Sequence, residues 1–348
     1  MTQKINLQLL MLFQDSFNLF SKLSAKKLVN AAQILQSYYA SQRNKTVFHK
    51  GLPISLAIEP TTSCNLRCPE CPSGLRSFTR PTGMLQEELF KNVIDELHET
   101  LIYLTFYFQG EPYLHPKFTD LVSYATSKKI YTSTSTNAHY LNEENARKTV
   151  ASGLDRLIIS IDGTTQETYQ QYRIGGKLEK VLAGTKEIVA WKQKLSSKTP
   201  HIIFQFLVVK PNEHQIPEVY KLAKQLGVDG VQLKTAQIYD FENGSSLIPE
   251  NPQYSRYQLL SDGKYGIKNA LDNNCWRMWQ SCVITWDGAV VPCCFDKDAH
   301  HKLGTLQEHD FKTIWQNEAY QNFRKQLLIS RSEIEMCKNC TEGTKVFG

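Results

Sequence analysis

Long apolar runs are missing from this sequence of 348 residues, which nowhere holds the ~18 uncharged apolar residues that a membrane-spanning helix needs. The apolar stretch at residues 7–13 is short, has only Lys4 as a basic residue before it, and lacks a small-residue cleavage site after it. Because a secretory signal needs these features, we expect neither a signal peptide nor a transmembrane segment. The expected location is the cytoplasm.

Basic blocks and basic stripes interleaved with aromatic residues are also missing. The 40 Lys and Arg residues exceed the 34 Asp and Glu residues by a formal charge of +6. Without a local block, this excess indicates a mildly basic surface and no nucleic-acid partner. Repeats and low-complexity tracts are absent too. Hydrophobic residues make up 41% of the chain, so we expect a large core in one α/β barrel with an appendage, or in two domains.

Strand and helix patterns alternate over residues 54–234. Apolar β-rich runs predict strands at 54–59, 101–108, 130–136, 156–161, 202–209 and 231–234, and helical patterns lie between them at 86–100, 118–129, 142–152, 177–194 and 215–226. Strands this apolar, each followed by a helix, favour a parallel sheet covered on both faces or a barrel. We therefore expect an α/β fold with six β/α units, whose chemistry lies at the C-terminal strand ends.

The flanking segments show other patterns. Apolar residues recur every three or four positions over residues 5–40, which predicts a helix that packs on the main domain, with a membrane surface or a partner as alternatives. Asp287-Gly288 between two apolar runs predicts a hairpin, and a helix is expected from residue 311 to about 329. The expected parts are an N-terminal helical segment (1–50), a barrel (51–234), a polar connecting or substrate-covering segment (235–274) and a small cysteine-rich module (275–348).

The nine cysteines fall in tight groups, which favours metal binding over disulfides. Cys64, Cys68 and Cys71 lie within eight residues, directly after the first predicted strand, with no histidine or fourth cysteine nearby. A structural zinc site needs four protein ligands, so this triad is a poor zinc site. Three thiolates on a [4Fe–4S] cluster would instead leave one iron open to another ligand.

The spacing CxxxCxxC after the first strand of a β/α array resembles the motif of the radical S-adenosylmethionine (SAM) superfamily. In that family the open iron chelates the methionine part of SAM, and one electron cleaves SAM to a 5′-deoxyadenosyl radical. The resemblance implies a partial (β/α)6 barrel and an electron donor such as flavodoxin or ferredoxin. One position departs from it, because Glu70 stands where the family usually has an aromatic residue near the adenine.

Polar residues at three later strand ends fit the same resemblance. The run 109–112 resembles the family's GGEP motif, whose carbonyls and glutamate can accept hydrogen bonds from an ammonium group. The runs 134–137 and 160–163 stand where the family contacts SAM, although both could merely cap helices. Arg173 resembles an arginine that neutralises the SAM carboxylate, with a surface ion pair as the alternative. The residues assigned to SAM are Gln109, Gly110, Glu111, Pro112, Thr136, Asn137, Ser160, Asp162 and Arg173.

The C-terminal cysteines resemble the SPASM and twitch auxiliary-cluster modules of the same superfamily. Twelve residues separate Cys275 from Gly288, four separate Gly288 from Cys293, and a CxxC motif closes the chain's cysteine pattern. Six cysteines follow residue 274, whereas two auxiliary clusters need seven, so the resemblance implies one auxiliary [4Fe–4S] cluster. Its expected ligands are Cys275, Cys293, Cys337 and Cys340.

Alternatives remain at this module. Cys294 could replace Cys293 with a shift of one residue, and Cys282 is expected to be a small buried hydrophobe. A four-cysteine zinc site is the alternative to an iron–sulfur cluster.

The resemblance implies an enzyme that abstracts a hydrogen atom from an unknown substrate, for oxidation or for peptide or protein modification. The alternatives are a small-molecule dehydrogenase of the twitch type and, from another class, a metal-bound scaffold without turnover. Four residues lie in segments that could border the barrel mouth, but the sequence assigns none of them as a catalytic base. These residues are Tyr239, Asp240, Asp296 and His300.

Overall fold

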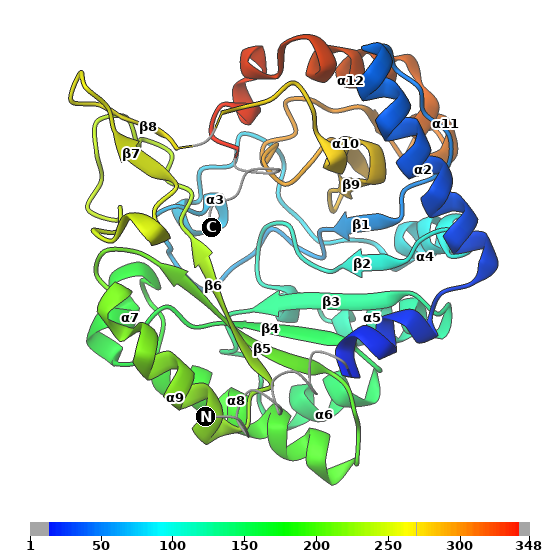
Figure 1. The fold of residues 1–348 in the computed structure, drawn as a ribbon. Helices are drawn as coiled ribbons and strands as arrows, with labels where there is room; N and C mark the ends of the chain where they lie inside the picture. The colour runs from blue at the N-terminus through cyan, green and yellow to red at the C-terminus, as the bar shows by residue number, and fades with distance from the viewer. Residues whose placement is uncertain (1–13, 269, 341–348) are drawn as a thin grey trace.

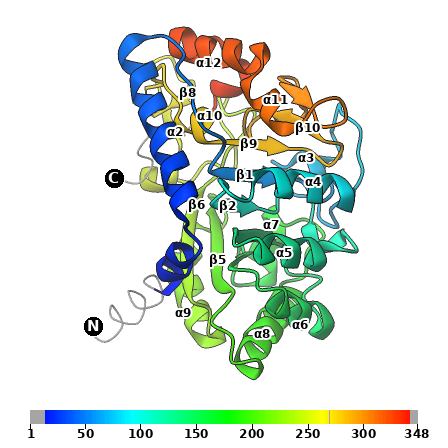
Figure 2. The same ribbon diagram turned by 90° about the vertical axis from the view of Figure 1, so that its right-hand side faces the viewer.

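The structure, a computed structural model, describes residues 14–268 and 270–340. Its centre is a nine-stranded sheet with the order β11-β10-β9-β1-β2-β3-β4-β5-β6. The strands β1 to β6 are all parallel to their neighbours and form a curved array with helices on its outer side (Figures 1 and 2). The predicted α/β fold with a parallel sheet of six β/α units is confirmed.

The observed elements lie within a few residues of the predicted ones. The strands are β1 (Ser55–Ile58), β2 (Tyr103–Thr105), β3 (Tyr131–Thr136), β4 (Arg156–Ser160), β5 (His201–Val208) and β6 (Gly230–Thr235). The helices of this region are α3 (Pro72–Leu75), α4 (Glu87–Leu97), α5 (Phe118–Ser127), α6 (Glu143–Ala151), α7 (Gln166–Tyr172), α8 (Leu178–Lys194) and α9 (Ile216–Leu226), with the 3-10 turns η1 (Pro112–Leu114) and η2 (Glu213–Gln215). Local signals explain the ends: α9 has a proline in its first turn and stops at Gly227, whose φ of 73° suits a glycine.

The N-terminal segment differs from the single helix predicted over residues 5–40. Within the described part, helical residues 14–21 are separated from α2 (Ala25–Asn44) by a break at which Ser24 caps α2. The prediction was wrong about continuity because apolar spacing continues across the break, while the serine side chain accepts the Lys27 amide in the first turn of α2. Residues 5–13 lie outside the described residues. Lys22 and Asp15 pair with Asp155 and Arg156 beside β4, so this segment packs on the sheet.

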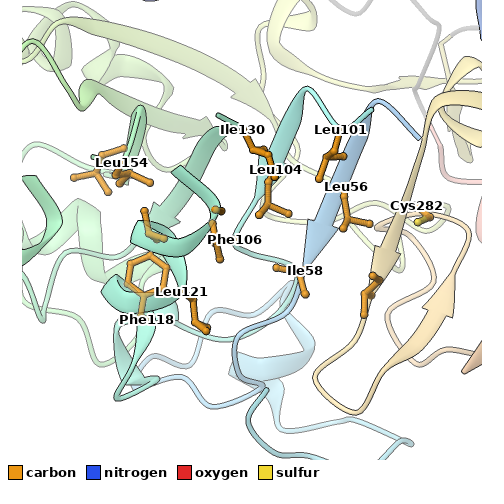
Figure 3. Packing of buried hydrophobic residues seen from close by; sticks show 14 of the residues in the cluster. Leu56, Ile58, Leu101, Leu104, Phe106, Phe118, Leu121, Ile130, Leu154 and Cys282 are labelled. Carbon is orange, nitrogen blue, oxygen red and sulfur yellow. The ribbon is translucent and has the colours of Figure 1, made fainter. Parts of the chain in front are cut away.

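The C-terminal part continues the main sheet. Strand β9 (Ser281–Ile284) pairs in parallel with β1, and β10 (Ala289–Val291) and β11 (Gly304–Thr305) follow in antiparallel pairing. Figure 3 shows the apolar core running from Phe118 and Leu121 across Leu104 and Leu56 to Cys282 on β9. The predicted hairpin at Asp287-Gly288 is confirmed, but no pattern in the sequence predicted that its first strand joins β1.

The remaining elements surround this extended sheet. They are the hairpin of β7 (Tyr257–Leu259) and β8 (Tyr265–Ile267), the helices α10 (Trp276–Gln280), α11 (Phe311–Gln316) and α12 (Glu318–Ser330), and the 3-10 turns η3 (Pro252–Tyr254), η4 (Arg331–Glu333) and η5 (Glu335–Cys337). The single helix predicted from 311 to about 329 is therefore wrong, because Asn317 ends α11 and caps α12 through the Tyr320 amide. No helix in the described ranges has the length and apolar character needed to cross a membrane.

Candidate functional site

The loop that follows β1, called the triad loop here (residues 59–80), carries Cys64, Cys68 and Cys71. Cys68 is buried and the other two are partly exposed. Helix α3 starts directly after Cys71 with a proline, which needs no amide partner in a first turn. None of the nine cysteines, all within the described residues, forms a disulfide. The triad loop therefore presents three thiols at the C-terminal end of a parallel strand.

Three polar side chains, two from strand ends and one from the end of α7, lie near the three sulfur atoms. Each belongs to the set that the sequence assigned to SAM, and each approaches a different cysteine. The Asn137 amide and the Arg173 guanidinium donate toward sulfur and stabilise negative charge there, whereas the Cys71 thiol is itself the donor to the Gln109 amide oxygen. The pairs are Asn137 Nδ2 with Cys64 Sγ at 4.0 Å, Arg173 Nη1 with Cys68 Sγ at 3.7 Å, and Gln109 Oε1 with Cys71 Sγ at 3.9 Å.

Glu111 joins two strand ends beside the triad. Its carboxylate accepts hydrogen bonds from Thr136 Oγ1 at 2.7 Å and from the Asn137 amide at 2.8 Å. Burial raises the pKa of Glu111 to about 7. Both carboxylate oxygens thus bind protein donors, and Glu111 fixes the backbone of Asn137, whose side chain reaches Cys64.

Gly110 allows the chain that follows β2 to lie in close contact with the triad loop. Its φ is +75°, and a Cβ atom there would lie 2.1 Å from the Thr61 carbonyl oxygen. The Gly110 amide donates to Ser73 Oγ at 2.8 Å, and the Glu111 amide donates to the Ser63 carbonyl at 2.8 Å. Residues 109–112 therefore hold the triad loop on both sides of its cysteines, and only glycine fits between them.

Arg173 is held by a buried carboxylate. Its Nε donates to Asp162 Oδ2 at 2.5 Å, and Asp162 also accepts from the Leu207 amide at 2.8 Å. Asp162 is fully buried, so this pair is not the surface ion pair that the sequence left open. Ser160 is buried beside Ser135, with 3.4 Å between their hydroxyl oxygens. Pro112 opens the turn η1.

Four C-terminal cysteines line one small cavity beside α12. They are Cys275, Cys293, Cys337 and Cys340, the four that the glycine spacing and the CxxC motif selected. Cys294 is exposed and is not among the residues that line this cavity. Cys282 lies in the apolar core, where burial raises the pKa of its thiol to about 12. In the described part of the chain, no three His, Cys, Asp or Glu side chains lie close enough together to hold a single metal ion.

A larger cavity of about 410 Å³ lies between the triad loop and the four-cysteine cavity. Pro72 and Leu75, just after Cys71, form part of its lining. Phe295 and Met336 line both this cavity and the four-cysteine cavity. It is called the central cavity below. Of the residues that the sequence placed near the barrel mouth, three line it and Asp240 does not; the three are Tyr239, Asp296 and His300.

Lys297 is a residue of the central cavity that sequence reasoning missed. Its ammonium group lies 3.9 Å from the centre of the Tyr239 ring, and burial lowers the pKa of Lys297 to about 8. Asp296 faces the same cavity, but its two oxygens accept the amides of His300 and His301 at 2.9 Å each. Asp296 therefore shapes its own loop. No motif surrounds Lys297, so the sequence carried no signal for it.

Glu70 connects the triad loop to the segment after β6. Its Oε2 accepts the Tyr239 amide at 2.9 Å, and burial raises the pKa of Glu70 to about 6. Glu70, the residue at which the sequence departs from the family motif, thus forms a hydrogen bond that attaches the segment after β6 to the triad loop.

The end of the triad loop is fixed to the C-terminal part through Arg80. Its guanidinium forms two hydrogen bonds with the buried carboxylate of Glu59, at 2.9 and 2.6 Å, and its Nε donates to the Lys297 carbonyl at 2.7 Å. Glu59 also accepts the Trp286 amide at 3.2 Å. Next to Arg80, the Thr79 amide donates to Asp298 at 2.8 Å.

Two family descriptions match the chain over these sites. The Radical SAM superfamily matches residues 58–223, and an iron–sulfur cluster-binding domain, SPASM, matches residues 275–341. The chain belongs to the radical SAM superfamily. It is an enzyme whose radical SAM domain binds a [4Fe–4S] cluster and SAM, and whose SPASM domain binds auxiliary iron–sulfur clusters. The residues present fit these groups, because three cysteines that form no disulfide lie on one loop, each with a polar side chain near its sulfur, and four other cysteines line one cavity.

Curated relatives cover most of the chain. A tungsten-containing aldehyde ferredoxin oxidoreductase cofactor-modifying protein from Pyrococcus furiosus is 26% identical over 77% of this chain and 82% of its own length. The AdoMet-dependent heme synthase of Methanosarcina barkeri is 26% identical over 76% and 82%. The mycofactocin maturase MftC of Mycobacterium tuberculosis is 26% identical over 78% and 72%.

Solved structures share the fold. SuiB from Streptococcus suis bound to S-adenosylmethionine has a TM-score of 0.62 at 12% identity and covers 90% of this chain and 79% of its own. The protein anSMEcpe with bound AdoMet has a TM-score of 0.61 at 19% identity, covering 83% and 88%. BtrN in complex with AdoMet and 2-DOIA has a TM-score of 0.52 at 19% identity, covering 85% and 95%.

Replacing Gly110 tests the contact between residues 109–112 and the triad loop. We expect Gly110→Ala to lose most of the iron bound at the triad, about four atoms per chain, because the new methyl group displaces the Thr61 backbone. Iron and sulfide content after anaerobic reconstitution measures this. Gly175→Ala is the matched control, since Gly175 has a φ of +81° and no atom within 4 Å of the added Cβ. Equal iron content in both variants would contradict the assigned role.

Removing the charge of Arg80 tests the buried pair. Arg80→Met leaves the Glu59 carboxylate buried without its partner, which should cost about 3–5 kcal/mol of unfolding free energy. Denaturant unfolding of the reduced, cluster-free chain measures the loss. The control is Lys91→Met, which breaks a solvent-exposed pair with Glu87 and should leave the stability almost unchanged. Similar stability of the two variants would show that the Glu59–Arg80 pair contributes little.

Proposed function

We propose that the enzyme oxidises or otherwise modifies a substrate bound in the central cavity. The supporting observation is the lining of that cavity. Pro72 and Leu75 directly follow the triad, and Phe295 and Met336 also line the four-cysteine cavity. A substrate in the central cavity would therefore have one cofactor site on either side of it.

The proposed ligands follow from the two thiol sets. Cys64, Cys68 and Cys71 hold the cluster that binds SAM, and Cys275, Cys293, Cys337 and Cys340 hold one auxiliary [4Fe–4S] cluster. Within the first site, we assign the contacts with SAM to the residues that the sequence selected: Gln109, Gly110, Glu111, Pro112, Thr136, Asn137, Ser160, Asp162 and Arg173. Of these, Glu111 and Asp162 act through the groups that they hold, Asn137 and Arg173.

When bound, the first cluster and SAM would supply a 5′-deoxyadenosyl radical for hydrogen-atom abstraction from the substrate, and the auxiliary cluster would supply an acceptor for the remaining electron. The protein's own residues orient these groups and exclude water. The Arg173 guanidinium, aligned by Asp162, suits the planar carboxylate of SAM. Lys297, partly buried over the Tyr239 ring, lines the central cavity together with His300 and His301, and these three side chains are the candidate proton acceptors there.

The substrate class has two candidates. A peptide or protein side chain is favoured by the maturase among the curated relatives and by the structure of SuiB bound to the precursor peptide SuiA, which has a TM-score of 0.61. A small molecule, and hence a dehydrogenase, is favoured by the cavity volume of about 410 Å³, which lies in the usual range for small-molecule sites. Both use the same cavity.

The cellular context follows from the thiol chemistry. Seven cysteines assigned to clusters need a reducing compartment, so we infer a cytoplasmic enzyme. A flavodoxin or ferredoxin is the proposed source of the electron.

Anaerobic reconstitution tests the proposal. The loaded protein should hold about eight irons and eight sulfides and should release 5′-deoxyadenosine when given SAM and a strong reductant. Alanine at Cys64, Cys68 or Cys71 should abolish this release, whereas Cys337→Ala should spare it and stop product formation. Absence of SAM cleavage in fully loaded protein would overturn the proposed function.

Adjacent cysteines provide a matched test of the auxiliary ligands. Cys293→Ala should lose about four irons per chain, because its thiol lines the four-cysteine cavity, whereas Cys294→Ala, at an exposed position, should keep them. Iron analysis together with zinc analysis measures both. Iron loss from Cys294→Ala alone, or zinc in place of iron at this site, would overturn the assignment.

A further inference from the structure

The four-cysteine cavity is lined by positive charge. Arg277 and Arg331 are among its lining residues, and none of the described residues that line it is acidic. The rest of the lining consists of the cysteines and apolar side chains, including Met278, Phe323 and Leu327. In such a low-dielectric environment a charge acts more strongly on its neighbours than it does in water.

Arg331 makes a direct contact with one of the four sulfur atoms. Its side chain is buried, and Nη2 lies 3.3 Å from Cys340 Sγ. Its Nη1 donates to the Asn274 carbonyl at 2.7 Å, and its own amide donates to Asn273 Oδ1 at 2.9 Å. The guanidinium is therefore fixed by the backbone just before Cys275, with one N–H directed at a cluster ligand.

A second buried arginine lies near the four-cysteine cavity but is not among the residues that line it. Arg324 is fully buried on α12, and its guanidinium donates to the carbonyls of Met278 and Trp315. It lies 4.7 and 4.6 Å from the centres of the Trp315 and Tyr320 rings. Among the described residues no carboxylate pairs with it. The groups around the Arg324 charge are therefore these two carbonyls and two aromatic rings.

We propose that Arg331 is a positioning residue that raises the reduction potential of the auxiliary cluster, an inference that rests on the proposed iron–sulfur ligation by Cys275, Cys293, Cys337 and Cys340. Taking up one electron adds one negative charge to a cluster already surrounded by thiolates. A hydrogen bond to a ligand sulfur and a nearby cation both favour that reduced state. Arg331 thereby adapts this site to accept an electron, whereas the triad site must donate one to SAM.

A redox titration followed by electron paramagnetic resonance tests this inference without substrate or turnover. The full chain, reconstituted anaerobically, is compared with two variants, Arg331→Gln and Lys325→Gln. The second is the control, because it removes one positive charge from an exposed position on α12, the helix that ends just before Arg331. We expect Arg331→Gln to move the midpoint potential of the auxiliary cluster to more negative values. The potential of the triad cluster, and both potentials in Lys325→Gln, should stay at the wild-type values.

The outcomes separate tuning from a purely structural role. An auxiliary potential unchanged in loaded Arg331→Gln would overturn the inference. If that variant fails to load iron, Arg331→Lys decides, because lysine keeps the charge but cannot donate to Cys340 and Asn274 with a planar fork. A more negative potential in Arg331→Lys supports the inference, and a wild-type potential overturns the part of it that rests on the hydrogen bond with Cys340. If the fully loaded wild-type chain does not cleave SAM, the proposed function is overturned, but the potentials of its clusters can still be measured.

Discussion

The arrangement of both cysteine sets depends on one buried carboxylate. Glu59 stands at the end of β1, just before the triad loop, and binds the guanidinium of Arg80 at the far end of that loop. The same carboxylate accepts the Trp286 amide from the turn after β9. A buried carboxylate is costly unless it is paired and hydrogen-bonded, and these three donors satisfy it. The two ends of the triad loop and the start of the C-terminal module are therefore held at a single point.

The pairing of β9 with β1 extends this constraint over the whole sheet. Four residues of β9 are in register with β1, from Ser281 opposite Ser55 to Ile284 opposite Ile58. A shift of one residue in this register would turn every side chain of β9 to the opposite face of the sheet. The SPASM domain is thus a continuation of the barrel sheet.

Sequence reasoning succeeded where the signal is local and failed where it is not. The six parallel strands follow from apolar runs and the triad stands out by its short spacing, whereas the four cysteines around one cavity were selected by their resemblance to the SPASM and twitch pattern. The β1–β9 pairing joins residues more than 200 positions apart, and no local pattern encodes it. Ser24 and Asn317 did carry a local signal, since both are good caps, but the apolar periodicity that continues past them hid it. Lys297 belongs to the central cavity through tertiary packing alone.

The hydrogen bond between Glu70 and the Tyr239 amide has a consequence for how such an enzyme diversifies. Glu70 binds the main chain of the segment that follows β6, and every amino acid except proline offers the same amide at position 239. The side chains of that segment can therefore change while the segment stays attached to the triad loop. A change of side chain at position 239, which lines the central cavity, thus alters the cavity and leaves this hydrogen bond intact.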